Sequence, residues 1–201
     1  MINVRVGLPS SRTMSRQSKE TFEALEKYSE IKFEVVVVSG THCAHARNIS
    51  SLADPKQLRG KIKQALPYDY YLSTDDDMAF RPENIERLVE ENLDIVGASY
   101  STREGPSDII VAKPFGAKTQ EDWLKVYDKG LKEVEWTGGG CILIKKNVFE
   151  AMEYPYWRNE VLIDGDEADL STEDSGFCIN ARKIGFKVYC DLDNRVAHIS
   201  R

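Results

Sequence analysis

The chain has 201 residues, of which 41% are hydrophobic and 30% charged, and its formal net charge is −6. This length fits one domain with a substantial buried core, and the composition is that of an ordinary soluble protein. The acidic balance excludes the general electrostatic footprint of a duplex nucleic-acid binder. No apolar run approaches the ~20 residues of a membrane span, and the N-terminus does not resemble a signal peptide. We therefore expect a cytoplasmic protein with no membrane span.

Apolar, β-branched runs alternate with helical patterns in the first half of the chain. Strands are predicted at residues 3–8, 33–39, 70–74 and 94–99, and the second is expected to be fully buried because it contains four consecutive valines. Helices are predicted at 18–28, at 44–66 with a break near Asp54-Pro55, and at 82–91. This order predicts a mostly parallel sheet flanked by helices.

The pattern is less regular after residue 100. Strands are predicted at 108–112, 134–136, 141–144 and 187–191, and helices at 147–152 and 173–184. Residues 113–132 are poorly periodic and are interpreted as an insertion, whereas 163–171 are interpreted as an acidic loop. Because no internal repeat or linker is present, we expect a single α/β domain over residues 1–201.

The four cysteines are widely separated in the sequence and include no CxxC pair. They are Cys43, Cys141, Cys178 and Cys190. This spacing argues against a zinc ribbon and favours reduced thiols, so four free cysteines are predicted.

The predicted strand at 70–74 ends in three consecutive carboxylates, Asp75, Asp76 and Asp77. Like charges this close repel one another, and a bound cation is the usual relief. Mg²⁺ and Mn²⁺ bind through one or two carboxylates and keep positions for substrate phosphates, and the end of a strand is where α/β sheets bind ligands. The alternative is a helix cap, but the next helix is predicted to begin only near Pro82. The triplet therefore predicts a metal or phosphate site.

Two other segments have residue types that suit an anionic ligand. Arg47 lies near the start of the predicted helix 44–66, where a guanidinium and free N–H groups both attract a diphosphate. The alternative for Arg47 is a solvated helix residue. Gly138, Gly139 and Gly140 lie between two predicted strands and allow the main chain to approach a ligand, or alternatively form a tight hairpin turn.

The C-terminal part offers a base and a further metal ligand. Glu173 or Asp174, at the start of the last predicted helix, could serve as a general base. The spacing of Ser171 and Asp174 also fits a capping box, which is the structural alternative. His198 is the only histidine in the last three quarters of the chain, and a neutral imidazole could complete an Mn²⁺ site with the aspartates.

Taken in order, these motifs resemble those of the GT-A glycosyltransferases, in particular small members related to family 2. The matching segments are Pro9-Ser10, Ala46-Arg47-Asn48, Asp75-Asp76-Asp77, residues 136–141, residues 173–177 and residues 196–199. The resemblance runs through most of the chain and implies a single-domain GT-A-like fold of the nucleotide-diphospho-sugar transferases. In that family the aspartate triplet is the DXD motif, which holds the metal and the donor diphosphate.

The resemblance implies a metal-dependent enzyme, hexosyltransferase-like, that uses Mn²⁺ or Mg²⁺ and moves a sugar from a nucleotide-diphosphate sugar to a hydroxyl acceptor. Asp77 would bind the metal, Asp75 would meet the ribose or the metal, and His198 would complete the metal shell. Asp174, beside Glu173, would be the base of an inverting enzyme. The residues expected to bind the donor are Pro9, Ser10, Arg12, Arg47, Asp75, Asp76, Gly138, Gly139 and Gly140. Residues 1–100 would form the nucleotide-sugar-binding half and residues 101–201 the acceptor and catalytic half.

The chain departs from the family at the positions that read the nucleobase. Many members have Tyr-Asn after the first strand and Asp after the second, where this chain has Ser10-Ser11-Arg12 and Ser39-Gly40-Thr41-His42. The nucleobase, sugar, acceptor and stereochemistry therefore stay open. Alternatives are a haloacid-dehalogenase-type phosphotransferase, whose Asp-x-Asp motif normally follows the first strand, and a non-catalytic nucleotide-sugar-binding module. A sugar nucleotidylyltransferase would need an N-terminal glycine-rich loop, which is absent.

Overall fold

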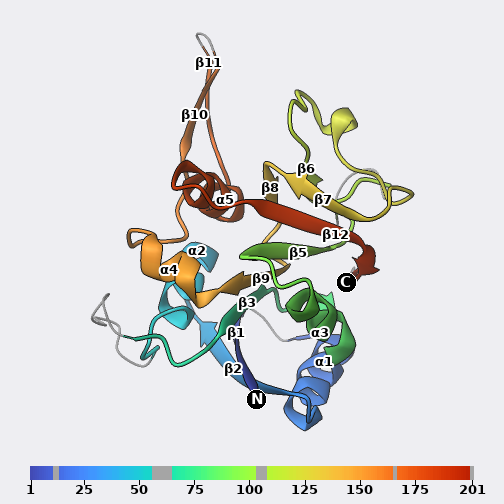
Figure 1. Ribbon diagram of the computed structural model, residues 1–201, viewed down its shortest axis with the longest axis vertical. Helices are drawn as coiled ribbons and strands as arrows, with labels where there is room; N and C mark the ends of the chain where they lie inside the picture. Colours follow the sequence, from blue (N-terminus) through green and yellow to red (C-terminus); the bar gives the residue numbers. More distant parts are fainter. Residues whose placement is uncertain (11–13, 56–64, 103–107, 165–166, 200–201) are drawn as a thin grey trace.

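A seven-stranded mixed sheet forms the centre of the computed structural model, which describes residues 1–10, 14–55, 65–102, 108–164 and 167–199 (Figure 1). The strand order is β2-β1-β3-β9-β5-β12-β7. The strands are β1 (Ile2–Ser10), β2 (Ile31–Ser39), β3 (Tyr70–Thr74), β5 (Ile95–Ser99), β7 (Leu131–Val134), β9 (Cys141–Lys145) and β12 (Val188–Arg195). The expected α/β architecture is confirmed. The sheet is mixed because β9 and β7 run antiparallel to their neighbours.

Helices cover both faces of this sheet (Figure 1). They are α1 (Arg16–Lys27), α2 (Cys43–Ser50), α3 (Pro82–Glu90), α4 (Lys146–Ala151) and α5 (Glu173–Lys183), with a 3-10 turn η1 (Gln120–Asp122). Alternate residues of β9 enter two separate cores: Leu143 packs with residues of α1 and α3, and Ile142 packs with residues of α4 and α5. This alternation is what a strand between two helical layers requires.

Within the described ranges, three pairs of short strands lie outside the central sheet. They are β4 (Met78–Ala79) with β13 (Ala197–His198), β6 (Ala112–Lys113) with β8 (Trp136–Thr137), and β10 (Val161–Asp164) with β11 (Glu167–Leu170). The segment predicted as an acidic loop at 163–171 therefore largely forms a hairpin, of which residues 165 and 166 lie outside the described ranges. The glycine run does not close a hairpin, because β8 pairs with β6 whereas β9 pairs with β3 and β5.

Helix α2 ends at Ser50, before the predicted break near Asp54-Pro55, and residues 56–64 of the predicted helix lie outside the described ranges. The expectation of a fully buried strand at 33–39 is wrong. Strand β2 is an edge strand of the sheet and is only partly buried, with Val37 51% exposed.

The four cysteines are free thiols, as predicted, and Cys141, Cys178 and Cys190 are buried. Among the described residues, no helix has the length and apolar character needed to cross a bilayer.

Candidate functional site

The predicted site residues gather at one edge of the central sheet. Strands β1, β3 and β5 run in the same direction, so their carboxyl ends meet at this edge. Strand β9 runs the opposite way between β3 and β5, and Cys141 at its start pairs with Thr74 at the end of β3. The glycine run that precedes Cys141 is therefore brought to the aspartates that follow Thr74. Ligands of α/β sheets bind at such an edge.

The first two aspartates of the triplet have separate protein partners. Asp75 Oδ1 lies 2.7 Å from Nη2 of Arg47, and Asp76 Oδ2 accepts a hydrogen bond from Ser10 Oγ at 3.2 Å. Asp76 is nearly buried, whereas the side chain of Asp75 is 34% exposed. Arg47 and Ser10 thus relieve part of the repulsion among the aspartates, which the sequence analysis expected a bound cation to relieve.

The third aspartate lies beside the C-terminal histidine. Asp77 Oδ1 is 3.3 Å from His198 Nε2, and the backbone N–H of Ile199 donates to the carbonyl of Asp77 at 2.8 Å. The pairing of β13 with β4 sets His198 opposite Met78 and fixes this contact. His198 Nδ1 is 3.4 Å from the carbonyl of Ser101, so the two ring nitrogens face a carbonyl oxygen and a carboxylate oxygen.

Asp77 and His198 form a donor pair that suits a divalent metal. Within the described ranges, no three His, Cys, Asp or Glu side chains are grouped for metal binding. One carboxylate oxygen and one imidazole nitrogen nevertheless fit Mn²⁺ when diphosphate oxygens and water supply its other ligands. Asp75, the third predicted metal ligand, has its Oδ1 in the ion pair with Arg47.

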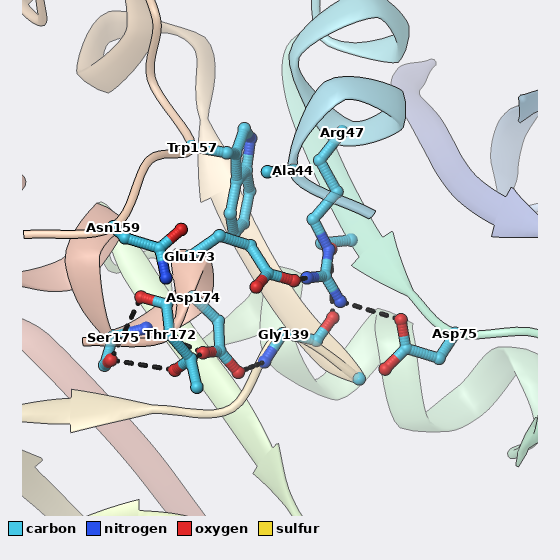
Figure 2. Close-up of polar contacts among 12 residues, drawn as sticks. Ala44, Arg47, Asp75, Gly139, Trp157, Asn159, Thr172, Glu173, Asp174 and Ser175 are labelled. Carbon is cyan, nitrogen blue, oxygen red and sulfur yellow. Dashed lines mark hydrogen bonds and ion pairs between the residues drawn. The ribbon is translucent and has the colours of Figure 1, made fainter. Parts of the chain in front are cut away.

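Arg47 is the centre of a buried ionic bridge (Figure 2). Its Nη1 contacts Glu173 Oε1, its Nη2 contacts Asp75, and its Nε donates to Ser73 Oγ at 2.9 Å. The guanidinium carbon lies 5.3 Å from the ring centre of Trp157. Burial opposes the charge, but Asp75 and Glu173 outweigh it and raise the pKa of Arg47, which stays protonated.

This position differs from both interpretations of Arg47 in the sequence. Arg47 lies in the second half of α2 rather than at its N-terminus, and it is 2% exposed rather than solvated. Its Nη1 and Nη2 groups are directed at carboxylates and its Nε group at the hydroxyl of Ser73.

The glycine run, Gly138 to Gly140, packs against the side chains of Tyr100 and Arg47. A Cβ at Gly138 would lie 2.1 Å from the hydroxyl of Tyr100, and one at Gly139 would lie 2.8 Å from the guanidinium of Arg47. The carbonyl of Gly139 accepts from Ser73 Oγ at 2.9 Å, and its N–H donates to Asp174 Oδ2 at 2.9 Å. The close approach predicted for these glycines is present, and protein side chains occupy it.

Asp174 is held in place by the glycine run and by the first turn of α5 (Figure 2). Besides Gly139, its donors are the N–H of Ser175 at 2.8 Å and the hydroxyl of Thr172. The predicted capping box is wrong, because Thr172 is the N-cap and Ser171 Oγ accepts from the N–H of Glu160. Asp174 is thereby fixed at the site edge.

The structure also places residues that the sequence did not single out. Tyr100 follows β5, and its hydroxyl accepts from the N–H of Gly140 at 3.0 Å. Burial, reinforced by Asp174 and Asp75, raises the pKa of Tyr100 well above 10, so the hydroxyl stays neutral. The sequence signal for Tyr100 is that it directly follows the predicted strand at 94–99, at the end where ligands of α/β sheets bind.

The donor-binding residues predicted after the first strand are only partly described. Pro9 and Ser10 close β1 at the same edge as the triplet, whereas Arg12 lies outside the described residues.

Comparisons with known proteins give similar folds but no family. No family model matches the chain, and no curated protein matches its sequence. The structure of A197 from STIV superposes with a TM-score of 0.60 at 16% identity, over 100% of this chain and 95% of that chain. GalNAc-T7, solved with UDP, GalNAc and Mn²⁺, gives a TM-score of 0.56 at 12% identity, over 100% of this chain and 44% of that chain.

These likenesses concern the architecture. GalNAc-T7 is a GT-A glycosyltransferase, so the fold of this chain is GT-A-like. The chain spans less than half the length of GalNAc-T7.

Proposed function

We propose that this protein is a metal-dependent glycosyltransferase, similar to small family 2 members, that moves a sugar from a nucleotide-diphosphate sugar to a hydroxyl acceptor. The observation that carries this proposal is the Arg47 bridge, which holds Asp75 and Glu173 on one guanidinium. The bridge thereby holds one carboxylate from residues 1–100 close to one from residues 101–201. The GT-A-like fold, and the UDP, GalNAc and Mn²⁺ in the GalNAc-T7 structure, support it.

Residues 1–100 would provide most of the donor site. Pro9, Ser10 and Asp76 would line the nucleotide, with Arg12 in the adjoining loop. Asp75 uses Oδ1 for Arg47 and would offer Oδ2 to the ribose. Arg47 would act on the donor by holding Asp75 in place.

Asp77 and His198 would hold the metal, together with donor oxygens. When bound, such an ion neutralises charge that develops on the departing diphosphate. The chain's own contribution is to orient this pair, through the contact of His198 Nδ1 with Ser101 and the docking of β13 on β4.

Asp174 would be the base that takes the proton of the acceptor hydroxyl. Each carboxylate oxygen has two lone-pair sites, and Asp174 Oδ2 uses one for Gly139. The second would accept the acceptor proton. Glu173 pairs with Arg47 and would help to hold Arg47 and Asp75 in position.

A thermal-shift panel of nucleotide sugars, each with and without Mn²⁺, tests the proposal. A donor at about 100 times its Kd should add roughly 2.7 kcal/mol to the free energy of unfolding, and only with the metal. Asp77→Ala and His198→Ala should remove the metal-dependent part. Asp193→Ala, at an exposed ion pair with Lys129, is the matched control and should leave it unchanged.

A full Mn²⁺-dependent shift in Asp77→Ala would contradict the metal assignment. Donor binding without hydrolysis or transfer would favour a non-catalytic nucleotide-sugar-binding module.

A further inference from the structure

The hairpin of β10 and β11 extends away from the body of the molecule, and the proposed reaction does not use it (Figure 1). Its base is fixed at Glu160 and Ser171: the N–H of Ser171 donates to the carbonyl of Glu160 at 2.9 Å, and the N–H of Glu160 donates to Ser171 Oγ at 2.8 Å. Thr172 and helix α5 follow directly. The hairpin is therefore attached beside the candidate site.

One face of this hairpin is apolar and exposed. Residues opposite one another in an antiparallel pair share a face, and residues two apart along a strand do too. Val161 pairs with Leu170 and Ile163 pairs with Ala168, so these four side chains share one face. All four are exposed, Ile163 to 75%. Such a face on a projecting element is typical of an interaction site.

The edges of the hairpin are also open. Within the described part of the chain, β10 and β11 pair only with each other, so each strand has an unpaired outer edge. A two-stranded hairpin is marginally stable in water, and a third strand stabilises it. Unpaired backbone N–H and C=O groups are a template for adding an extended segment.

The charge of the hairpin selects among possible partners. The sequence from 161 to 170 has four carboxylates and no Lys or Arg, and the whole chain has a net charge of −6. A second copy would bring the same negative charge, and so would an acidic peptide. A basic segment is attracted instead. On the face opposite the apolar one, Leu162 pairs with exposed Asp169, where a basic side chain can lie.

We propose that the β10–β11 hairpin binds an extended polypeptide segment in which apolar and basic residues alternate. The segment adds to an open edge as a third strand. Its apolar side chains continue the face of Val161 and Ile163, and its basic side chains lie on the face of Asp169. The bound segment then runs beside the N-terminus of α5. Binding of this kind does not depend on the proposed transfer reaction.

Fluorescence anisotropy with a labelled eight-residue peptide of alternating Lys and Val tests this directly on the full chain. A peptide of the same composition in two blocks and an alternating Glu and Val peptide are the controls. The alternating basic peptide should bind at least about tenfold more tightly than either control. Its affinity should fall as salt is raised.

Variants separate this surface from general stickiness. Ile163→Ser should weaken binding of the basic peptide about tenfold, the scale of losing one buried apolar side chain, and Asp169→Lys should weaken it too. Val37→Ser, at the exposed position of β2, should leave it unchanged. Because Ile163 is largely exposed, its substitution should leave the circular dichroism spectrum and the melting temperature as they are.

Three results would overturn the proposal. The first is binding that is absent, or equal for all three peptides, or unchanged in Ile163→Ser. The second is a dimer seen by light scattering that Ile163→Ser abolishes, which would assign the face to a second copy. The third is sedimentation with phosphatidylcholine vesicles that Ile163→Ser abolishes, which would assign it to a lipid surface.

Discussion

Arg47 is a buried side chain at the candidate site whose charge is paired with two carboxylates. It is buried, and it compensates Asp75 and Glu173 at the same time. Removing one partner of a buried ionic group leaves uncompensated charge, so Arg47→Ala should lower the free energy of unfolding by roughly 3–5 kcal/mol. Urea unfolding measures this change.

Arg16 is the matched control for that measurement. It also pairs with a glutamate, Glu20, but its side chain is 91% exposed. Arg16→Ala should change stability far less than Arg47→Ala, because solvent screens an exposed ion pair. Adding Asp75→Asn and Glu173→Gln to Arg47→Ala should recover part of the loss, because the unpaired charges are then gone. Equal, small effects of Arg47→Ala and Arg16→Ala would show that the buried bridge does not stabilise the fold.

A substitution of Asp174 can distinguish a catalytic role of its carboxylate from a structural one. Asn keeps the shape and can accept from Gly139 through its oxygen, but its NH2 group then faces the N–H of Ser175, and it cannot take a proton. We expect Asp174→Asn to keep donor affinity, to lower the melting temperature slightly because one hydrogen bond of the carboxylate is lost, and to reduce turnover by about 10²-fold or more. Steady-state kinetics and a thermal shift on the same preparation give both quantities. Near-normal turnover would exclude Asp174 as the base.

At the scale of elements, helix α5 is tied to the hairpin base through one carboxylate. Glu160 accepts from Arg158 Nε at 2.8 Å, Asn180 Nδ2 at 2.9 Å and Lys183 Nζ at 2.9 Å. These hydrogen bonds, from Arg158 first and then Lys183 and Asn180, lower the pKa of Glu160 from 4.5 to about 2. The folded state thus favours the ionised carboxylate.

The lowered pKa of Glu160 determines how the free energy of unfolding depends on pH. A depressed folded-state pKa contributes stability that is complete above the unfolded value and is lost as pH falls through the folded value. Glu160→Gln should therefore cost roughly 1 kcal/mol between pH 5 and pH 8, and the difference from the parent should shrink between about pH 4.5 and pH 2. Urea unfolding across this range measures it. A constant difference down to pH 2 would contradict the prediction.

Elements with strong periodicity could be predicted from the sequence, and those that depend on distant partners could not. The strand at 70–74 and the helix begun by Pro82 lie where their patterns indicated. The two-residue strands β4 and β13 carry no periodic signal, because each exists only through the other. The interpretation of 163–171 as an acidic loop misses the hairpin of β10 and β11, because the acidic residues mask a period-two apolar pattern.

At the scale of the whole molecule, the sequence predicted which residues meet but not how they are joined. Alternating strands and helices imply a common carboxyl edge, and that edge does gather Ser10, the aspartates and the glycine run. The insertion of antiparallel β9 between β3 and β5 could not be predicted, since strand order depends on the packing of the entire sheet. The same holds for Arg47, whose partner Glu173 is 126 residues away in sequence.

The distribution of cysteines makes thiol chemistry a reporter on the whole fold. Cys141, Cys178 and Cys190 lie in β9, α5 and β12 and are 0% exposed, so a reagent reaches them only when the core opens. Cys43 is half-buried, but burial raises the pKa of its thiol to about 12, so at pH 8 little thiolate is present to react.

We therefore expect an aromatic disulfide reagent to label four thiols at once in guanidinium chloride and none at the rate of a free thiol in native buffer. Cys43 should react first in the native protein, and Cys43→Ser should remove that phase alone. The other three should react together at the rate of opening, because they belong to one cooperative structure. Separate rates for the three would mean that β9, α5 and β12 open independently.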